Sequence, residues 1–207
     1  MSSYKKIGLY GGTFSPPHKG HISAARNFAL QEELDELLII PAFLPPHKEI
    51  SSEVSADARL QMCEIAFKDV ERARVCDLEI IRQGKSYTYL TLLELSEKYK
   101  DAHFSLLCGT DMILSFDTWY HFEDIFKMAD IVYMRREEDE EISLQLKKKI
   151  AQYREKYGAK IRELLGDVLE ISSTQLRHSI SKGENTSDFL TGETEEYIKK
   201  WNLYQGK

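Results

Sequence analysis

The sequence has little of what marks a secreted or membrane-bound protein. Its 207 residues include only three cysteines, Cys63, Cys76 and Cys108, an odd and widely spaced set that forms neither a disulfide framework nor a metal-ligand pattern. We therefore expect reduced thiols in a cytoplasmic protein. The N-terminus lacks the apolar run of a signal peptide. The longest apolar run, 36–46, is short and interrupted by proline, so we expect no bilayer span and no membrane partner.

Basic residues are also fewer than acidic residues. The chain has 28 Lys and Arg against 34 Asp and Glu, a formal net charge of −6. This excess of negative charge argues against nucleic acid or an anionic membrane as a partner, whereas an anionic substrate needs only a local concentration of positive charge. Five prolines and eleven glycines argue against a long disordered region, and 42% apolar residues suffice for a sizeable core. The length suits one domain, residues 1–207.

Short apolar runs alternate with segments of helical periodicity along most of the chain. This alternation predicts βαβ crossovers and an α/β fold, a Rossmann-like doubly wound parallel sheet flanked by helices. A small helical part is expected at 172–207. The charged segment 137–165 is expected to be an exposed helix, with a solvated face rather than a partner surface. The expected strands are 6–10, 36–42, 74–80, 103–109, 130–135 and 167–171, and the expected helices are 21–31, 55–70 and 88–99.

Three polar or glycine-rich turns follow predicted strands. The stretch "GGTFSPPHKGH" (11–21) follows the first strand, 109–111 follows the fourth, and 172–174 follows the last. Ligands of parallel α/β sheets bind beyond the carboxyl ends of the strands. We therefore expect these turns to meet at one edge of the sheet and to form a binding site there.

The first turn has the chemistry of a phosphate-binding site. Gly11 and Gly12 allow a ligand to approach the backbone closely, because no Cβ intervenes. Backbone N–H groups at such a turn and at the start of the next helix bind phosphate oxygens, and His18 and His21 can donate further hydrogen bonds. The Walker A and Rossmann glycine patterns are both absent. Taken alone, the turn could also be purely structural.

The turn at 171–177, "ISSTQLR", has similar chemistry. Ser173 and Thr174 at a helix start offer hydroxyl and backbone N–H groups to an anion. Arg177 follows Thr174 by three residues, so both lie on one helical face, and its guanidinium can clamp two phosphate oxygens. Taken alone, this segment could simply be an N-capped helix.

Together, the two segments resemble the signatures of the nucleotidylyltransferase superfamily. The stretches "LPPHK" (44–48), "SYT" (86–88) and "GTDMILSFDTWY" (109–120) resemble, more narrowly, the bacterial nicotinate mononucleotide adenylyltransferases. The resemblance extends over 6–135 and from 167 to the C-terminus. It implies that nicotinate mononucleotide is joined to ATP, giving deamido-NAD and pyrophosphate in NAD biosynthesis. Because the sequence offers no dedicated carboxylate cage, we expect Mg²⁺ to be carried by the ATP, with no metal site of its own.

The resemblance also implies roles for individual residues. Trp119 is expected to stack on the pyridine ring, and Thr88 and Tyr120 to offer backbone N–H groups to its carboxylate. Lys19 is expected to add positive charge. The implied ATP-binding residues are Gly11, Gly12, Thr13, Phe14, His18, His21, Gly109, Asp111, Ser173, Thr174 and Arg177, with His18, His21 and Arg177 as catalytic residues; the implied mononucleotide-binding residues are His47, Lys48, Thr88, Trp119 and Tyr120.

Several alternatives remain open at the level of sequence. The acceptor could be nicotinamide mononucleotide, pantetheine phosphate or another phosphorylated compound, and the protein could be a nucleotide-binding sensor without turnover. Trp119 and Tyr120 could be core residues, and Asp111 an ordinary helix-start residue. Ser15 stands where the family usually has Asp, which removes a carboxylate although serine supports a turn nearly as well. Both a monomer and a small homo-oligomer are compatible with the sequence.

Overall fold

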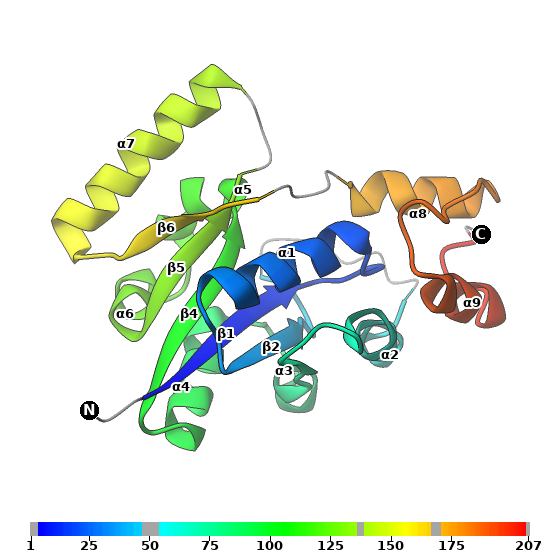
Figure 1. The fold of residues 1–207 in the computed structure, drawn as a ribbon, viewed down its shortest axis with the longest axis horizontal. Helices are drawn as coiled ribbons and strands as arrows, with labels where there is room; N and C mark the ends of the chain where they lie inside the picture. Colours follow the sequence, from blue (N-terminus) through cyan, green and yellow to red (C-terminus); the bar gives the residue numbers. More distant parts are fainter. Residues whose placement is uncertain (1–3, 47–53, 136–138, 167–170, 206–207) are drawn as a thin grey trace.

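A parallel β-sheet forms the centre of the computed structural model, which describes residues 4–46, 54–135, 139–166 and 171–205 (Figure 1). Its six strands have the order β3-β2-β1-β4-β5-β6, and every neighbouring pair is parallel. This confirms the predicted Rossmann-like fold. The strands are β1 (Lys5–Gly12), β2 (Glu36–Pro41), β3 (Ala73–Val75), β4 (Ala102–Gly109), β5 (Ala129–Met134) and β6 (Ile161–Leu164).

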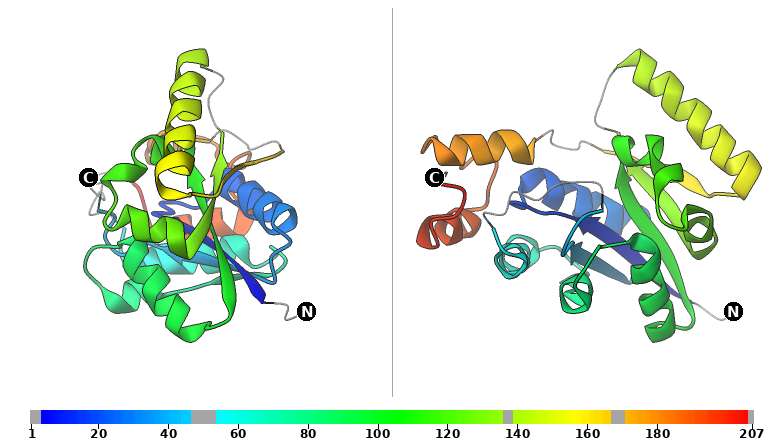
Figure 2. Two further views of the ribbon diagram at one scale, coloured as in Figure 1. Left: turned by 90° about the vertical axis from the view of Figure 1, so that its left-hand side faces the viewer. Right: turned by 180° about the vertical axis from the view of Figure 1, so that it is seen from behind.

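Helices cover both faces of the sheet (Figure 2). One face packs against α1 and α2 through residues such as Phe28 and Phe67, and the other against α4, α6 and α7 through Leu92, Phe126 and Tyr153. The helices are α1 (Lys19–Gln31), α2 (Ala56–Phe67), α3 (Leu78–Arg82), α4 (Thr88–Lys98), α5 (Thr110–Leu114), α6 (Phe122–Met128), α7 (Glu140–Tyr157), α8 (Ser173–Ser181) and α9 (Gly192–Lys200), with a 3-10 turn η1 (Phe116–Thr118).

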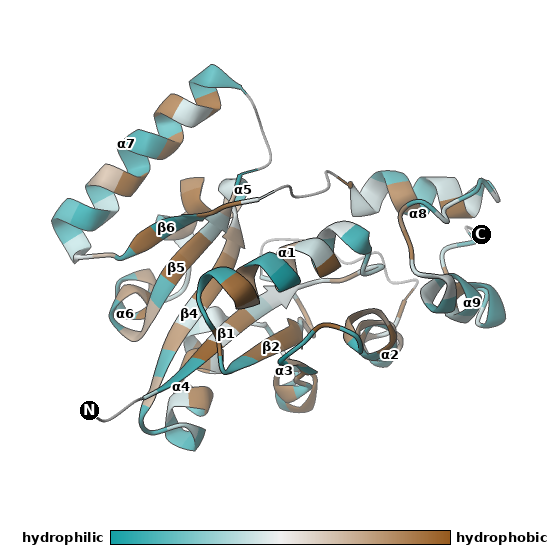
Figure 3. Ribbon diagram, viewed as in Figure 1, coloured by the Kyte–Doolittle hydropathy of each residue, from teal (hydrophilic) through white to brown (hydrophobic). Residues whose placement is uncertain are grey.

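Burial on both faces explains why the strands read as continuous apolar runs rather than alternating ones. In β2, the four residues from Leu37 to Ile40 are all at most 2% exposed. Figure 3 shows the same contrast, with apolar strands inside and polar outer helices such as α7 and α9. In the described ranges, none of the helices combines the length and the apolar composition that a membrane span requires.

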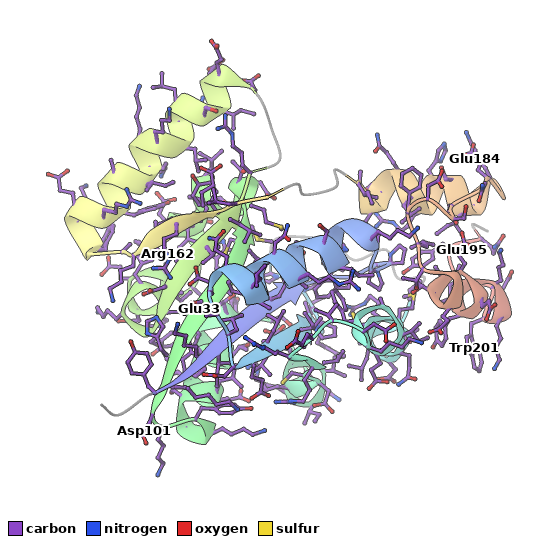
Figure 4. All side chains as sticks on the ribbon, viewed as in Figure 1. Glu33, Asp101, Arg162, Glu184, Glu195 and Trp201 are labelled. Atoms are coloured by element: carbon purple, nitrogen blue, oxygen red, sulfur yellow. The ribbon has the colours of Figure 1, made fainter. Side chains whose placement is uncertain are left out.

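The C-terminal helices form a separate small core against α2. Leu176 and Ile180 of α8 and Ile198 of α9 pack with Met62 of α2. Figure 1 places α8 and α9 at the end of the molecule toward which β1 runs. In Figure 4, the side chains of Glu184 and Trp201 lie at the outer edge of this part, far from the sheet. The expected helical part at 172–207 is therefore positioned beside the carboxyl end of β1.

Two predicted elements were wrong. The segment 137–165 is not helical throughout, because α7 ends at Gly158, which adopts a left-handed C-cap with φ 64°. The chain then forms β6, which supplies the sixth strand before the range where we expected it; residues 167–170 lie outside the described residues.

The third predicted strand, 74–80, stops at Val75, and α3 follows. There the buried Glu79 carboxylate accepts a hydrogen bond of 2.6 Å from Thr91 Oγ1.

The strand order reverses between β1 and β4. The chain moves from β1 outward through β2 to β3, then returns to the other side of β1 and continues through β4 and β5 to β6. At such a switch point the adjacent connections diverge and leave a crevice beyond the carboxyl ends of the strands. The turn after β1 and the turn after β4, which contains Asp111, flank this point.

Candidate active site

The turn after β1 rests on a buried aromatic side chain. Phe14 has a left-handed backbone with φ 49°, and its ring is only 3% exposed. The ring packs edge-on against Tyr10 and Phe67, with centroid separations of 5.4 and 5.6 Å. A Cβ added at Gly12 would lie 3.0 Å from this ring. The Phe14 ring is therefore part of the core on which the turn packs. Because the ring is buried, only the Phe14 backbone can line a nucleotide site.

His18 and His21 form a reciprocal capping box at the start of α1. His18 Nδ1 accepts from the His21 backbone N–H at 3.3 Å, and His21 Nδ1 accepts from the His18 backbone N–H at 3.2 Å. The two rings stack with centroids 3.6 Å apart. A neutral imidazole whose Nδ1 accepts a hydrogen bond has its proton on Nε2. The capping box thus assigns Nε2–H as the donor of both rings.

This arrangement gives the two histidines a structural and a chemical role at once. The side chain of His18 is 4% exposed and satisfies a backbone donor in the first turn of α1. The N-terminus of a helix also attracts anions through its N–H groups and its dipole. Two imidazole donors beside a helix N-terminus are suited to hold phosphate oxygens.

The second signature, at 171–177, lies against the first, as we expected of turns that meet at one edge of the sheet. Ser172 caps α8, its Oγ accepting from the Gln175 backbone N–H at 3.4 Å. Arg177 Nη2 donates to Thr174 Oγ1 at 3.1 Å, which confirms that these two side chains share a helical face. Arg177 Nη1 donates to the carbonyl oxygen of Ser15 at 2.8 Å, across 162 positions of sequence.

The turn after β4 completes the edge. Gly109 is the N-cap of α5 and provides no side chain for capping, and Asp111 is exposed in the first turn of that helix. Thr110 Oγ1 donates to the carbonyl oxygen of Met134 at 3.0 Å, which ties the turn to the neighbouring strand β5. Asp111 therefore stands on a fixed turn beside the switch point.

The residues expected to hold the mononucleotide base form a second group. Thr88 begins α4, whose N-cap residue Tyr87 makes no side-chain capping hydrogen bond. The rings of Tyr87 and Tyr120 lie 4.8 Å apart, so these two segments meet. Trp119 stacks on Phe116 at 4.6 Å and is partly buried, whereas Tyr120 is 48% exposed. His47 and Lys48 lie outside the described residues.

Two residues at this edge were not predicted from the sequence. Arg59 and Tyr204 are buried and hydrogen-bonded to the turn that follows β1. Arg59 was detectable, because it lies three and four residues before Met62 and Cys63 on the buried face of α2. The Lys19 ammonium, expected to add positive charge, donates to the carbonyl oxygen of Ser187 at 2.8 Å, a contact that leaves its charge in place.

The chain also resembles known proteins in sequence and in fold. The cytidylyltransferase-like family model matches residues 9–179. A probable nicotinate-nucleotide adenylyltransferase from Exiguobacterium sibiricum is 34% identical over 199 residues, covering 96% of this chain and 98% of that protein. One from Listeria monocytogenes serotype 4a is 33% identical over 202 residues, covering 98% of each.

The chain thus belongs to the cytidylyltransferase-like nucleotidyltransferases, and within them to the nicotinate-nucleotide adenylyltransferase family. The family resemblance seen in the sequence is confirmed. The fold also matches the structure of Plasmodium falciparum nicotinic acid mononucleotide adenylyltransferase complexed with NaAD, with a TM-score of 0.75 at 20% identity over 99% of both chains.

Proposed function

We propose that this protein transfers the adenylyl group of ATP to nicotinate mononucleotide, forming deamido-NAD and releasing pyrophosphate. One observation carries the proposal: Arg177 of the second signature is hydrogen-bonded to Ser15 of the first, beside the stacked histidines. The names of its full-length relatives support the same reaction. We further propose a cytoplasmic location for the reaction, where the three free cysteines stay reduced.

The triphosphate of ATP would lie over the start of α1. There, His18 and His21 donate from Nε2, and Arg177, Ser173 and Thr174 approach from α8. An oxygen of the mononucleotide phosphate forms a bond to the α-phosphorus of ATP. The bond from that phosphorus to the bridging oxygen breaks, and pyrophosphate leaves with the electron pair. No protein nucleophile is required, so the protein acts by positioning and by stabilising charge.

Mg²⁺ enters this proposal as an ion carried by ATP. Among the residues that the structure describes, no group of three or more His, Cys, Asp or Glu side chains is arranged to hold a metal ion. Phosphate oxygens are the hard ligands that Mg²⁺ favours. When bound, the ion offsets negative charge on the triphosphate, while His18, His21 and Arg177 supply the donors of the protein.

The start of α4 supports the acceptor assignment in this proposal. Its first N–H groups receive no side-chain cap, and the N-terminus of a helix favours a carboxylate over a neutral amide. We propose that the backbone N–H groups of Thr88 and Tyr120 donate to the nicotinate carboxylate, with Trp119 stacking on the pyridine ring. The contact between the Tyr87 and Tyr120 rings, 4.8 Å apart, supports this by bringing the two segments together. An uncapped helix start beside aromatic rings therefore supports the acid, rather than nicotinamide mononucleotide, as the preferred acceptor.

The deciding experiment measures pyrophosphate release from ATP and Mg²⁺ with three acceptors in parallel: nicotinate mononucleotide, nicotinamide mononucleotide and pantetheine phosphate. We expect nicotinate mononucleotide to give the highest kcat/KM and mass spectrometry to detect deamido-NAD. His21→Ala should lower kcat by about 10²–10³. His178→Ala, at an exposed histidine on α8, is the matched control and should be unaffected.

Each other outcome contradicts a defined part of the proposal. Preference for the amide would retain the adenylyl transfer and refute the carboxylate role of the start of α4. Preference for pantetheine phosphate would refute the assigned acceptor. Nucleotide binding by folded protein without turnover on any acceptor would indicate a sensor.

A further inference from the structure

Arg59 of α2 is a buried arginine that the reaction described above does not use. Its side chain is 1% exposed. Nη1 donates to the carbonyl oxygen of Thr13 at 2.8 Å, and Nη2 donates to the carbonyl oxygen of Phe43 at 3.2 Å. Its Nε is buried without a hydrogen-bond partner among the described residues. The guanidinium thus bridges two backbone segments that are 30 residues apart in sequence.

The two carbonyl groups belong to neighbouring turns at the edge of the sheet that carries the active site. Thr13 follows β1, and Phe43 follows β2, the strand paired with β1. The strands remain paired up to these turns, since the Ala42 N–H donates to the Gly12 carbonyl oxygen at 2.9 Å. Beyond this last backbone contact, the Arg59 guanidinium connects the two turns.

The second of these turns is also tied to the acceptor side. The Phe43 N–H donates to Ser86 Oγ at 2.9 Å, and the Ser86 N–H donates to the Leu44 carbonyl oxygen at 2.9 Å. Ser86 lies two residues before Thr88, the first residue of α4. We call the turn at Thr13 the ATP turn and the turn at Phe43 the acceptor turn. A continuous series of contacts connects the ATP turn, through Arg59 and the acceptor turn, to the expected carboxylate site at the start of α4.

Burial of this charge is costly, which argues that the position serves more than packing. Burial lowers the pKa of Arg59, and the two titratable neighbours that act on it, Cys63 and Tyr204, are a thiol and a phenol rather than carboxylates. An arginine remains protonated in proteins and can hold two acceptors with one planar group. A neutral residue of similar size would avoid the cost but could not hold both turns.

We propose that Arg59 is a positioning residue, which holds the ATP turn and the acceptor turn in the relative position required for in-line transfer. The expected effect on turnover rests on the proposed function. The clamp, by which we mean the Arg59 guanidinium bridging the two turns, can be tested without catalysis. Because Arg59 acts through the backbone of Thr13 and Phe43, its loss should affect turnover at saturation more than the KM of either substrate.

The test compares Arg59→Lys, Arg59→Gln and the control Arg72→Gln. Arg72 also donates to a backbone carbonyl, that of Leu34 at 2.7 Å, but at the amino-terminal edge of the sheet. We expect both Arg59 variants to lose about 10- to 100-fold in kcat, since small misplacements of reacting groups have effects of this size. The lysine variant keeps the charge but cannot span two carbonyl groups as a planar fork does, so it should also lose turnover.

Hydrogen–deuterium exchange of the ligand-free proteins provides the second readout. Peptides that cover residues 10–15 and 42–46 should exchange faster in the Arg59 variants and at the wild-type rate in Arg72→Gln. Unchanged exchange, or a lower Tm with normal kcat per folded molecule, would overturn the proposal. If one Arg59 variant does not fold, the other decides. A wild-type protein that makes no deamido-NAD would refute the proposed function, and the exchange data would still test the clamp.

Discussion

Ser15 and Tyr204 share a buried hydrogen bond, with Ser15 Oγ 3.0 Å from the Tyr204 hydroxyl oxygen across 189 positions of sequence. The contact connects the C-terminal end of the chain to the turn that leads into α1, where His18 and His21 form the capping box. Ser15 also stands where the resembling family usually has Asp. In this protein the side chain at that position is 6% exposed, and Tyr204 is its hydrogen-bond partner.

Removing either partner should destabilise the protein, because the remaining hydroxyl stays buried. We expect Ser15→Ala and Tyr204→Phe each to lower the free energy of unfolding by about 1–2 kcal/mol. The double variant should lose less than the sum, with a coupling of about 1 kcal/mol. Urea unfolding measures all three values. Tyr197→Phe is the control, since the Tyr197 hydroxyl makes no hydrogen bond within the described residues. Additive losses would contradict the coupling.

The same tyrosine predicts a pH dependence of stability. Burial raises the pKa of Tyr204 above its ordinary value, so its phenol stays protonated in the folded protein at a pH where an unfolded tyrosine, with a pKa of about 10, ionises. The contribution of Tyr204 to stability is therefore complete below about pH 10 and declines above it. Urea unfolding at pH 8, 9.5 and 11 should show the difference between wild type and Tyr204→Phe decreasing. A constant difference would contradict the prediction.

Variants of His18 separate capping from phosphate binding. His18→Ala removes both the helix cap and the imidazole, so it should lose about 1 kcal/mol of stability and about 10²–10³ in kcat. His18→Asn restores a good N-cap and should recover the stability, while turnover stays low. Thermal unfolding and steady-state kinetics on both variants test this. Normal turnover in the asparagine variant would exclude His18 from catalysis.

Gly11 and Gly12, which the structure places at the end of β1 rather than in the turn after it, should respond differently to alanine. A Cβ at Gly11 would meet no atom within 4 Å in the ligand-free protein, so Gly11→Ala should fold normally. Its methyl group would occupy space expected for the nucleotide, and we expect ATP affinity to fall about tenfold, or about 1.4 kcal/mol.

By contrast, Gly12→Ala places its Cβ 3.0 Å from the Phe14 ring and should cost about 1–3 kcal/mol of stability. Calorimetric ATP titration together with thermal unfolding distinguishes the two effects. Equal stability losses in both variants would show that the Phe14 ring does not restrict Gly12.

Much of the fold was predictable because its signals are local. The runs that became β1, β2, β4 and β5 are short, apolar and followed by turns, and α1 and α4 have clear helical periodicity. Where two local signals competed, prediction was wrong. The "AKIREL" stretch continued an apparent helix, although Gly158 ended α7 and the buried Ile161 and Leu164 formed β6.

The sequence alone determined the family, the parallel sheet and the two signatures, because strand periodicity, turn residues and helix starts depend on near neighbours. Only the tertiary structure decided how these parts are connected: Ser15 to Arg177 and Tyr204, and Arg59 to Thr13 and Phe43. These contacts join residues of α2, α8 and the C-terminal end to the turns at Thr13–Ser15 and Phe43. No local pattern specifies such a partner, since the partner depends on how α2, α8 and the C-terminal end pack at one edge of the sheet.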